Sequence, residues 1–250
     1  MSQYLSGSYF CLTDRGKVRK INEDYASAHI NPFGNVLMMV ADGMGGANKG
    51  EVASSNVINY ISHAFLSLEK EFKNEKAMSK WIYKVLKEAN AKIYQKANSD
   101  KSFKGMGTTL SLVLLVKDKL LTAQVGDSRV YLFVDNKLKQ ITEDQTYVNY
   151  LIKSKGMPKE IAYTHPKRHE LTNALGTKSR LNVDINIFDY CNERILICSD
   201  GLYNNVPEND LASIIRGNDS IDKKANQLIA FGNFNGGSDN MALILWESKN

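Results

Sequence analysis

The sequence lacks the features of secreted, disulfide-linked or membrane-spanning proteins. It has only three cysteines in 250 residues, namely Cys11, Cys191 and Cys198. Their number is odd and their spacing fits no metal-binding motif, which predicts reduced thiols without a disulfide. No segment approaches the roughly 20 apolar residues of a membrane span, and the first ten residues lack a basic stretch followed by an apolar run. These absences predict a soluble, cytoplasmic protein with no membrane partner.

Proline is also scarce, with four residues dispersed along the chain. No linker, repeat or low-complexity tract divides the sequence, so we expect residues 1–250 to form a single domain. The net charge of +5 comes from lysines and arginines scattered over the whole length. Since no basic arm or patch is concentrated anywhere, the composition predicts no nucleic-acid partner.

Several catalytic motifs are absent as well. No cysteine is followed by an arginine six residues later, and neither Gly-x-Ser-x-Gly nor Gly-x-x-x-x-Gly-Lys-Ser/Thr occurs. Their absence disfavours a cysteine-dependent phosphatase, a serine esterase and a nucleotide-binding kinase. His165 and His169 have the spacing of a helical zinc pair, but Pro166 interrupts the helix and stands where a metalloprotease has the glutamate that acts as its base.

Apolar periodicity predicts the first elements. The continuous apolar run Val36–Ala41 ends at an Asp-Gly turn and fits a buried strand. Stripes of apolar residues from Val57 to Leu68 and from Ile82 to Ile93 indicate two helices. The charged stretch Glu69–Lys80 is interpreted as a solvated connection between them.

After Gly107 the pattern changes to short β-type runs, at Leu110–Val116, Leu120–Val125, Val130–Val134 and Leu138–Ile141. Tight turns separate these runs, and we expect one antiparallel meander. Two later apolar runs, Ile195–Cys198 and Met241–Trp246, flank a helical pattern at Lys223–Phe231. This order favours an α+β fold in which helices pack outside antiparallel sheets.

Aspartates stand at the ends of the apolar runs, at Asp42, Asp127, Asp200 and Asp239. A carboxylate at the end of a rigid strand is well placed to hold Mg²⁺ or Mn²⁺, because these hard cations prefer oxygen ligands. A single Asp-Gly pair is more often a plain turn. The ordered set of aspartates along the chain is a more specific signal of a metal site than any single Asp-Gly pair.

Six short motifs occur in one order: Arg19-x-x-Asn22-Glu23-Asp24, Asp42-Gly43-Met44-Gly45-Gly46, Gly107-Thr108-Thr109, Gly126-Asp127-Ser128-Arg129, Ser199-Asp200-Gly201-Leu202 and Ser238-Asp239-Asn240. This series, which opens with Thr13-Asp14-Arg15-Gly16-Lys17-Val18-Arg19 and runs to Trp246, resembles the metal-dependent type 2C protein serine/threonine phosphatases in their compact bacterial form. The resemblance implies a single catalytic domain, a four-layer α-β-β-α sandwich with two central antiparallel sheets.

The resemblance also implies the reaction. A water activated by a binuclear Mn²⁺ or Mg²⁺ centre would hydrolyse phosphoserine and phosphothreonine in protein substrates, with a weaker third metal as an addition. No phosphoenzyme would form. The expected partners are phosphorylated proteins and a cytoplasmic serine/threonine kinase whose action the enzyme opposes, and the expected oligomeric state is a monomer.

Most of the metal ligands follow from the same resemblance. Asp42 matches the carboxylate that bridges two metals, and the Gly43 carbonyl matches a ligand of one of them. Asp200 and Asp239 match ligands of the other metal.

Other site residues match less directly. Glu23 matches an acidic residue on the Gly43 side that acts directly or through water, and Asp24 is expected to act in support. Asp127 matches a ligand of the weaker third metal. Arg19 matches the arginine that binds the substrate phosphate. Its planar guanidinium can donate to two phosphate oxygens at once.

The sequence departs from the family pattern at four positions. Met44 occupies a place where many eukaryotic relatives have a histidine assigned as general acid, and methionine has no proton to donate. Gln145 replaces a common histidine, Asn173 a common arginine and Ala242 a frequent threonine. The last three are not metal ligands, so they bear on substrate recognition more than on activity.

Two segments keep open interpretations. Residues Thr146–His169 match the family's flap and are either a mobile, substrate-contacting segment or a surface loop with one helix. Whether Glu160 or another acid of the flap completes a third metal site is left open by the sequence. Arg129 either contacts phosphate or pairs with a neighbouring acid, and the second is favoured.

Two rival functions remain. One is a module of the same fold that captures phosphoproteins without turnover, which the intact acidic set disfavours. The other is a metal-dependent hydrolase of nucleic acids or small phosphate esters, which the lack of an interleaved aromatic and basic surface disfavours.

Overall fold

The computed structural model describes residues 5–45, 49–99 and 101–249 of the chain. Strand β3 (Val36–Met44) shows how the sequence builds its layers. Its fully buried side chains alternate between two clusters: Leu37, Met39 and Ala41 pack towards helices, whereas Val36, Met38 and Val40 pack towards a second sheet. Because successive strand residues point to opposite faces, a strand that is apolar on both faces must be covered on both sides.

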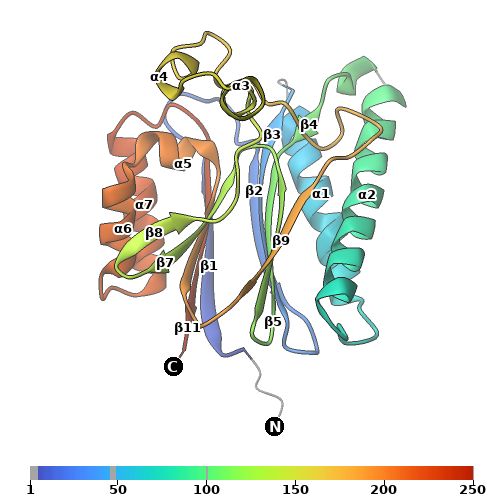
Figure 1. Ribbon diagram of the computed structural model, residues 1–250, viewed down its shortest axis with the longest axis vertical. Helices are drawn as coiled ribbons and strands as arrows, with labels where there is room; N and C mark the ends of the chain where they lie inside the picture. The colour runs from blue at the N-terminus through green and yellow to red at the C-terminus, as the bar shows by residue number, and fades with distance from the viewer. Residues whose placement is uncertain (1–4, 46–48, 100, 250) are drawn as a thin grey trace.

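Antiparallel pairing builds two sheets that face one another (Figure 1). The first has the order β1-β11-β10-β7-β8, with strands Gly7–Asp14, Met241–Ser248, Arg194–Cys198, Arg129–Val134 and Lys137–Gln140. The second has the order β2-β3-β5-β6-β9, with β2 at Asp24–Ile30, β5 at Leu110–Val116, β6 at Lys119–Val125 and β9 at Asp184–Asp189. A short strand, β4 (Gly107–Thr108), pairs with the end of β3.

Helices cover both outer faces (Figure 1). Helices α1 (Lys49–Leu66) and α2 (Glu75–Ser99) pack on the second sheet, and a 3-10 turn at Lys101–Phe103 follows them. On the first sheet lie α5 (Asp200–Asn205), α6 (Glu208–Arg216) and α7 (Ile221–Phe234). The expected α+β class and four-layer sandwich are therefore confirmed. Two more helices, α3 (Tyr147–Lys155) and α4 (Lys159–Ala162), cross the upper end in this view.

The predicted meander is wrong. Strands β5 and β6 pair in one sheet, whereas β7 and β8 pair in the other. The chain changes sheets through the turn at Gly126, whose φ of +92° is readily adopted only by a residue without Cβ. The four runs thus form two hairpins instead of one continuous sheet.

The charged stretch Glu69–Lys80 is only partly a connection. Helix α2 begins at Glu75, because Asn74 accepts a hydrogen bond from the Ala77 amide at 2.9 Å and so caps the helix. The second half of the stretch is therefore the first turns of α2. Among the described residues, no helix combines the length and apolar character that crossing a membrane requires.

Candidate active site

The strand pairing gathers acidic residues at one end of the sandwich. In the second sheet, Asp24 at the start of β2 lies opposite Asp42 near the end of β3. In the first sheet, β10 and β11 are antiparallel neighbours. Asp200 stands just after β10 and Asp239 just before β11, so antiparallel pairing brings them to one edge. Asp127 lies in the turn between β6 and β7.

The segments that carry these acids approach so closely that side chains are excluded between them. A Cβ added to Gly201 would lie 1.9 Å from the Asn240 carbonyl oxygen and 3.2 Å from Asp239 Cβ. A Cβ on Gly43 would lie 2.2 Å from the Gly50 carbonyl oxygen. The glycines that follow Asp42 and Asp200 are thus required for close packing.

This packing gives a prediction for Gly201→Ala. In an ordinary helix, alanine is more favourable than glycine by about 1 kcal/mol. Here the methyl group would force α5 away from β11, and we expect a net loss of about 1–3 kcal/mol of unfolding free energy. Urea denaturation checks this value; a variant more stable than wild type would contradict the close approach.

Burial and mutual repulsion raise the pKa values of the acids. Asp24 is 6% exposed, and burial, with repulsion from Asp200 and Asp239, raises its pKa to about 7. Burial also raises the pKa of Asp127 to about 7, with further repulsion from Asp200. The pKa of Asp42 stands well above its usual range, first because its carboxyl is buried and then because four other aspartates surround it. Burial, followed by repulsion from Asp239, raises the pKa of Asp200.

This donor set fits hard divalent cations in its chemistry. The acids lie close enough to disfavour one another's charge, and a cation among them would remove that cost. In the described part of the chain, however, no group of three or more histidine, cysteine, aspartate or glutamate side chains is already arranged to hold a metal ion. The carboxylates therefore share one region without converging on one point.

Arg19 and Glu23 stand at the same end. Arg19 Nη2 donates to Asp239 Oδ2 at 2.7 Å, and the arginine side chain is half-exposed. Glu23 Oε1 accepts a hydrogen bond from the Gly50 amide at 2.9 Å, at the start of α1. A Cβ on Gly50 would lie 2.5 Å from both Glu23 Oε1 and the Gly43 carbonyl carbon, so Glu23 and Gly43 are close neighbours. The structure thus brings together all eight predicted site residues.

Three supporting side chains were not predicted. Ser199 donates to Asp24 Oδ2 at 2.6 Å. Asn240 accepts from the Glu23 amide at 2.9 Å and donates to the carbonyls of Arg15 and Ile21, both at 2.8 Å, so it fastens the segment that carries Arg19. Thr109 lies beside the Asp42 amide, with its Oγ1 at 2.9 Å. Each belongs to one of the six motifs, which was the available signal, but the motifs alone assigned it no role.

Two of the departures from the family pattern contact each other. Asn173 Nδ2 donates to Gln145 Oε1 at 2.7 Å, and the same oxygen accepts the Gly126 amide at 2.9 Å. The backbone N–H of Gln145 donates in turn to the Gly126 carbonyl oxygen at 2.9 Å. These two residues therefore hold the turn that presents Asp127.

The favoured interpretation of Arg129 is confirmed, because it forms an ion pair with Asp144 at 2.7 Å. The flap contains two helices instead of one. Helix α3 is capped by Thr146 and ends at Gly156, which has a left-handed φ of 65°. Tyr147 lies 5.2 Å from His165 and 6.0 Å from Tyr150, between ring centroids. Glu160 is exposed on α4.

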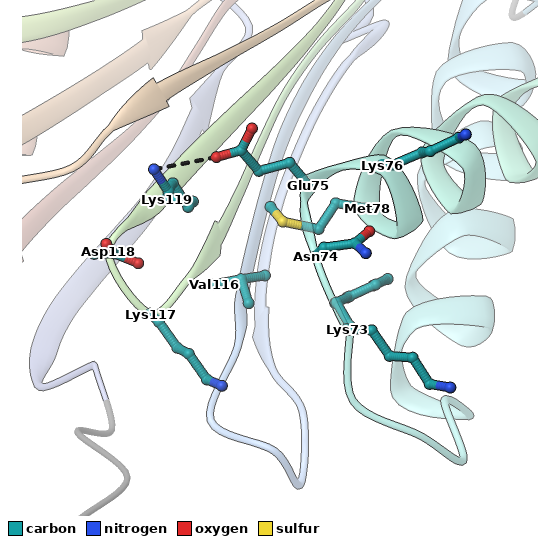
Figure 2. Close-up of a pocket in the computed structure, with 10 residues that line it drawn as sticks. Lys73, Asn74, Glu75, Lys76, Met78, Val116, Lys117, Asp118 and Lys119 are labelled. Atoms are coloured by element: carbon teal, nitrogen blue, oxygen red, sulfur yellow. Dashed lines mark ion pairs between the residues drawn. The ribbon is translucent and has the colours of Figure 1, made fainter.

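A cavity of about 410 Å³ lies away from these acids (Figure 2). It is formed where the α1–α2 connection meets the β5–β6 hairpin, with Met78 and Val116 among its apolar lining residues. Four lysines line it: Lys73, Lys76, Lys117 and Lys119. None of the predicted site residues contributes to it, so the acidic end of the sandwich is the candidate active site.

Known proteins share both the sequence and this architecture. The protein phosphatase 2C family model matches residues 15–228. The serine/threonine phosphatase Stp of Listeria welshimeri is 36% identical over 236 residues, which are 94% of this chain and 93% of that relative. A solved serine/threonine phosphatase of S. agalactiae has a TM-score of 0.91 and 30% identity, over 97% of this chain and all of that one.

A further solved structure bears on the metal. The catalytic domain of the serine/threonine protein phosphatase PstP, solved with two manganese ions, has a TM-score of 0.84 and 29% identity, over 98% of this chain and 100% of that one. The fold and the acidic site thus define a phosphatase of the metal-dependent class. The chain belongs to the protein phosphatase 2C family, and it is a protein serine/threonine phosphatase of the compact bacterial form.

Proposed function

We propose that this phosphatase hydrolyses phosphoserine and phosphothreonine with two Mn²⁺ or Mg²⁺ ions held by its acidic end, and that a weaker third ion binds beside them. The observation that carries the proposal is the placement of five aspartates at one end of the sandwich, where their proximity and burial raise the pKa values of four of them. Side chains that repel one another at the end of a rigid sandwich are costly unless a cation is bound there.

The assignment of residues follows their places. Asp42 would contact both ions and the Gly43 carbonyl one of them, with Glu23 on the same side. Asp200 and Asp239 would hold the other ion. Asp127 would serve the third, and Asp24, whose carboxylate accepts from Ser199, would support Asp42 from the neighbouring strand.

When bound, such a pair of cations supplies positive charge for the phosphoryl oxygens and a water of lowered pKa as the nucleophile. The chain's own residues do the rest. Asp42 would hold the ions from near the end of a strand whose preceding residues are buried. Met44 has no proton to donate, so the leaving hydroxyl takes its proton from water or from another group.

Arg19 is proposed to bind the substrate phosphate. In the structure its guanidinium is held by Asp239, and metal binding to that carboxylate would leave the fork available to two phosphate oxygens. We expect Arg19→Ala to raise KM for a phosphopeptide by about 10-fold to 100-fold, because one charge-assisted contact to the phosphate is lost. The effect on kcat is expected to be smaller. Steady-state kinetics check the split.

The matched control is Arg19→Lys, which keeps the charge without the fork. Only a minor part of the lost affinity is expected to return, because lysine presents a point charge. Wild-type KM in the lysine variant would contradict bidentate binding, and an unchanged KM in the alanine variant would remove Arg19 from the site.

Several wider properties belong to the same proposal. The substrates are phosphoproteins, which require a serine/threonine kinase to supply them, and we place both enzymes in the cytoplasm. The free cysteines Cys11 and Cys191 agree with a reducing compartment. We further propose a monomer in which residues 1–250 form one catalytic domain that has neither nucleic-acid nor membrane partners.

A single comparison separates the proposal from its rivals. We would measure turnover of a phosphothreonine peptide, an oligonucleotide and a generic aryl phosphate under identical Mn²⁺ conditions. Preferential turnover of the peptide supports the protein phosphatase. Binding of the peptide without turnover would favour the phosphoprotein-binding module, and preferential cleavage of the oligonucleotide would favour a nucleic-acid hydrolase.

A further inference from the structure

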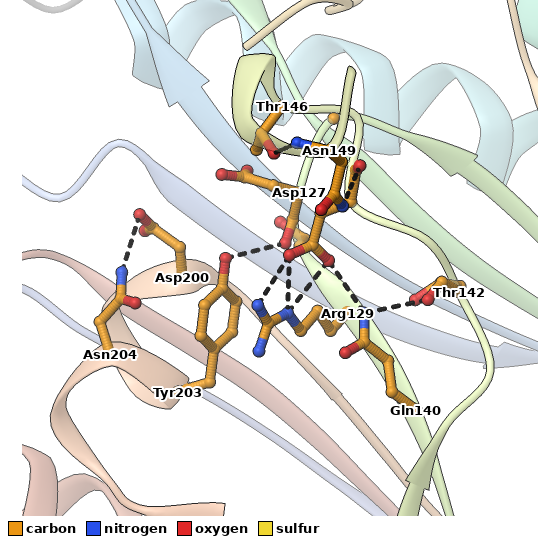
Figure 3. A network of polar contacts seen from close by, with 12 residues as sticks. Asp127, Arg129, Gln140, Thr142, Thr146, Asn149, Asp200, Tyr203 and Asn204 are labelled. Carbon is orange, nitrogen blue, oxygen red and sulfur yellow. Dashed lines mark hydrogen bonds and ion pairs between the residues drawn. The ribbon is translucent and has the colours of Figure 1, made fainter. Parts of the chain in front are cut away.

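One guanidinium lies at the centre of a polar network beside the proposed metal site (Figure 3). Arg129 Nε donates to the Asp144 oxygens at 3.0 and 3.1 Å, and Nη2 donates to Asp144 Oδ2 at 2.7 Å. Its Cζ lies 3.6 Å from the centroid of the Tyr203 ring, and Nη1 donates to the Tyr131 hydroxyl at 3.1 Å. The guanidinium of Arg129 is thereby held by hydrogen bonds in its plane and by the Tyr203 ring against its face.

The first arm of the network reaches the aspartate turn. Tyr203 belongs to α5, the helix that begins at Asp200, and its hydroxyl donates to the Asp127 carbonyl oxygen at 3.1 Å. In Figure 3 the carboxylates of Asp127 and Asp200 lie on the same side of this tyrosine. The stacked ring therefore fixes the spacing between the turn of Asp127 and the start of α5.

The second arm reaches the flap. Asn149, in α3, donates through Nδ2 to the Asp144 carbonyl oxygen at 2.8 Å. Gln140 Nε2 donates to Asp144 Oδ1 at 2.9 Å, which fixes the carboxylate from the strand side. Helix α3 crosses the same end of the sandwich (Figure 1). Through Asn149 and Tyr203, the flap helix and the turn that carries Asp127 are therefore both connected to the Arg129–Asp144 pair.

We propose that Arg129, Tyr203 and Asn149 are positioning residues that hold Asp127 and the flap helix in register with the metal site. The proposal rests on the metal-binding function proposed above. It assigns different effects to the two arms: Tyr203 sets how well metal binds near Asp127, Asn149 sets how α3 meets a protein substrate, and Arg129 governs both. Arginine is required because a lysine would neither stack on the ring nor fork to the carboxylate.

The test combines calorimetric Mn²⁺ titration with phosphopeptide kinetics. Removing a residue that supports a metal ligand typically lowers metal affinity or activity by about 10-fold to 100-fold. Arg129→Met is therefore expected to weaken Mn²⁺ binding by about 10-fold or more and to raise the KM for the peptide. Tyr203→Phe keeps the stacked ring and loses one hydrogen bond, which predicts about a threefold to tenfold weaker Mn²⁺ binding. Asn149→Ala is expected to raise peptide KM with Mn²⁺ binding unchanged.

The matched control is Lys153→Met. Lys153 also joins α3 to the segment before it, through an ion pair with Glu143, but both side chains are at least half-exposed. Wild-type Mn²⁺ binding is expected there, because an exposed ion pair contributes little. If Arg129→Met does not fold, the Tyr203 and Asn149 variants decide, and wild-type behaviour in both would overturn the proposal. Wild-type protein that binds no Mn²⁺ in the calorimeter would instead overturn the metal assignment.

Discussion

Asp42→Ala is expected to reduce phosphopeptide turnover by about a thousandfold or more, at the upper end of the cost of removing one electrostatic group from an active site. Asp42 faces Asp24 across the strand pair and is repelled by every other aspartate of the site. It is thus the carboxyl around which the other aspartates of the site are gathered. We expect the same loss for Asp239→Ala, which removes the carboxylate that also holds Arg19.

Both variants are expected to remain folded, because each removes a like charge from a crowded site instead of a buried contact. Circular dichroism and thermal unfolding check this without metal. Asp118→Ala is the matched control, since Asp118 is exposed in the β5–β6 turn beside the cavity of Figure 2 and should leave turnover unchanged. A folded Asp42→Ala or Asp239→Ala variant that keeps more than about a tenth of wild-type activity would contradict the metal assignment.

The metal-free protein is expected to be more stable at pH 5.5 than at pH 8. Asp24 and Asp127 have pKa values of about 7 when folded, whereas an unfolded aspartate titrates near about 4. Between about pH 4 and 7 the folded chain binds more protons than the unfolded chain. The free energy of unfolding therefore falls as the pH rises through this range, and it levels off above it. A total change of a few kcal/mol corresponds to a melting temperature about 5–10 °C higher at the lower pH.

Mn²⁺ is expected to oppose this trend. Metal binds the deprotonated carboxylates, so the stabilisation that 1 mM Mn²⁺ produces should grow as pH rises from about 5.5 to 8. Differential scanning calorimetry with Mn²⁺ and with chelator measures both effects. Asp42→Asn is the control variant, because it removes one repelling charge and should flatten the metal-free dependence. Metal-free stability that rises with pH over this range would contradict the crowded acidic site.

The elements that the sequence predicted share one property, which is a clear apolar pattern. The all-apolar run of β3 and the helical stripes of α1 and α2 were recognised because both faces of the strand, and one face of each helix, are buried. Strand β1 was missed because none of its residues is fully buried and most are only partly buried, so it shows no clear apolar face. The meander was wrong because a local pattern shows a hairpin but not the sheet to which its strands belong.

The site was predicted in part for a different reason. The acidic residues were identified by the order of their motifs and by the family resemblance, since no local pattern separates Asp42 from an ordinary turn aspartate. Ser199 and Asn240 could not be predicted in the same way. Their partners Asp24 and Glu23 lie 175 and 217 positions away in the chain, so only the folded topology brings them together.

The central claim is that this chain is a phosphatase whose activity depends on a metal held by its aspartates. The most direct test is phosphate release from a phosphothreonine peptide by the purified chain, first with Mn²⁺ and then with excess chelator. The account predicts release with Mn²⁺ that stops on chelation and returns when Mn²⁺ is restored. Release that continues at the same rate in chelator, or no release while Mn²⁺ is shown to be bound, would contradict it.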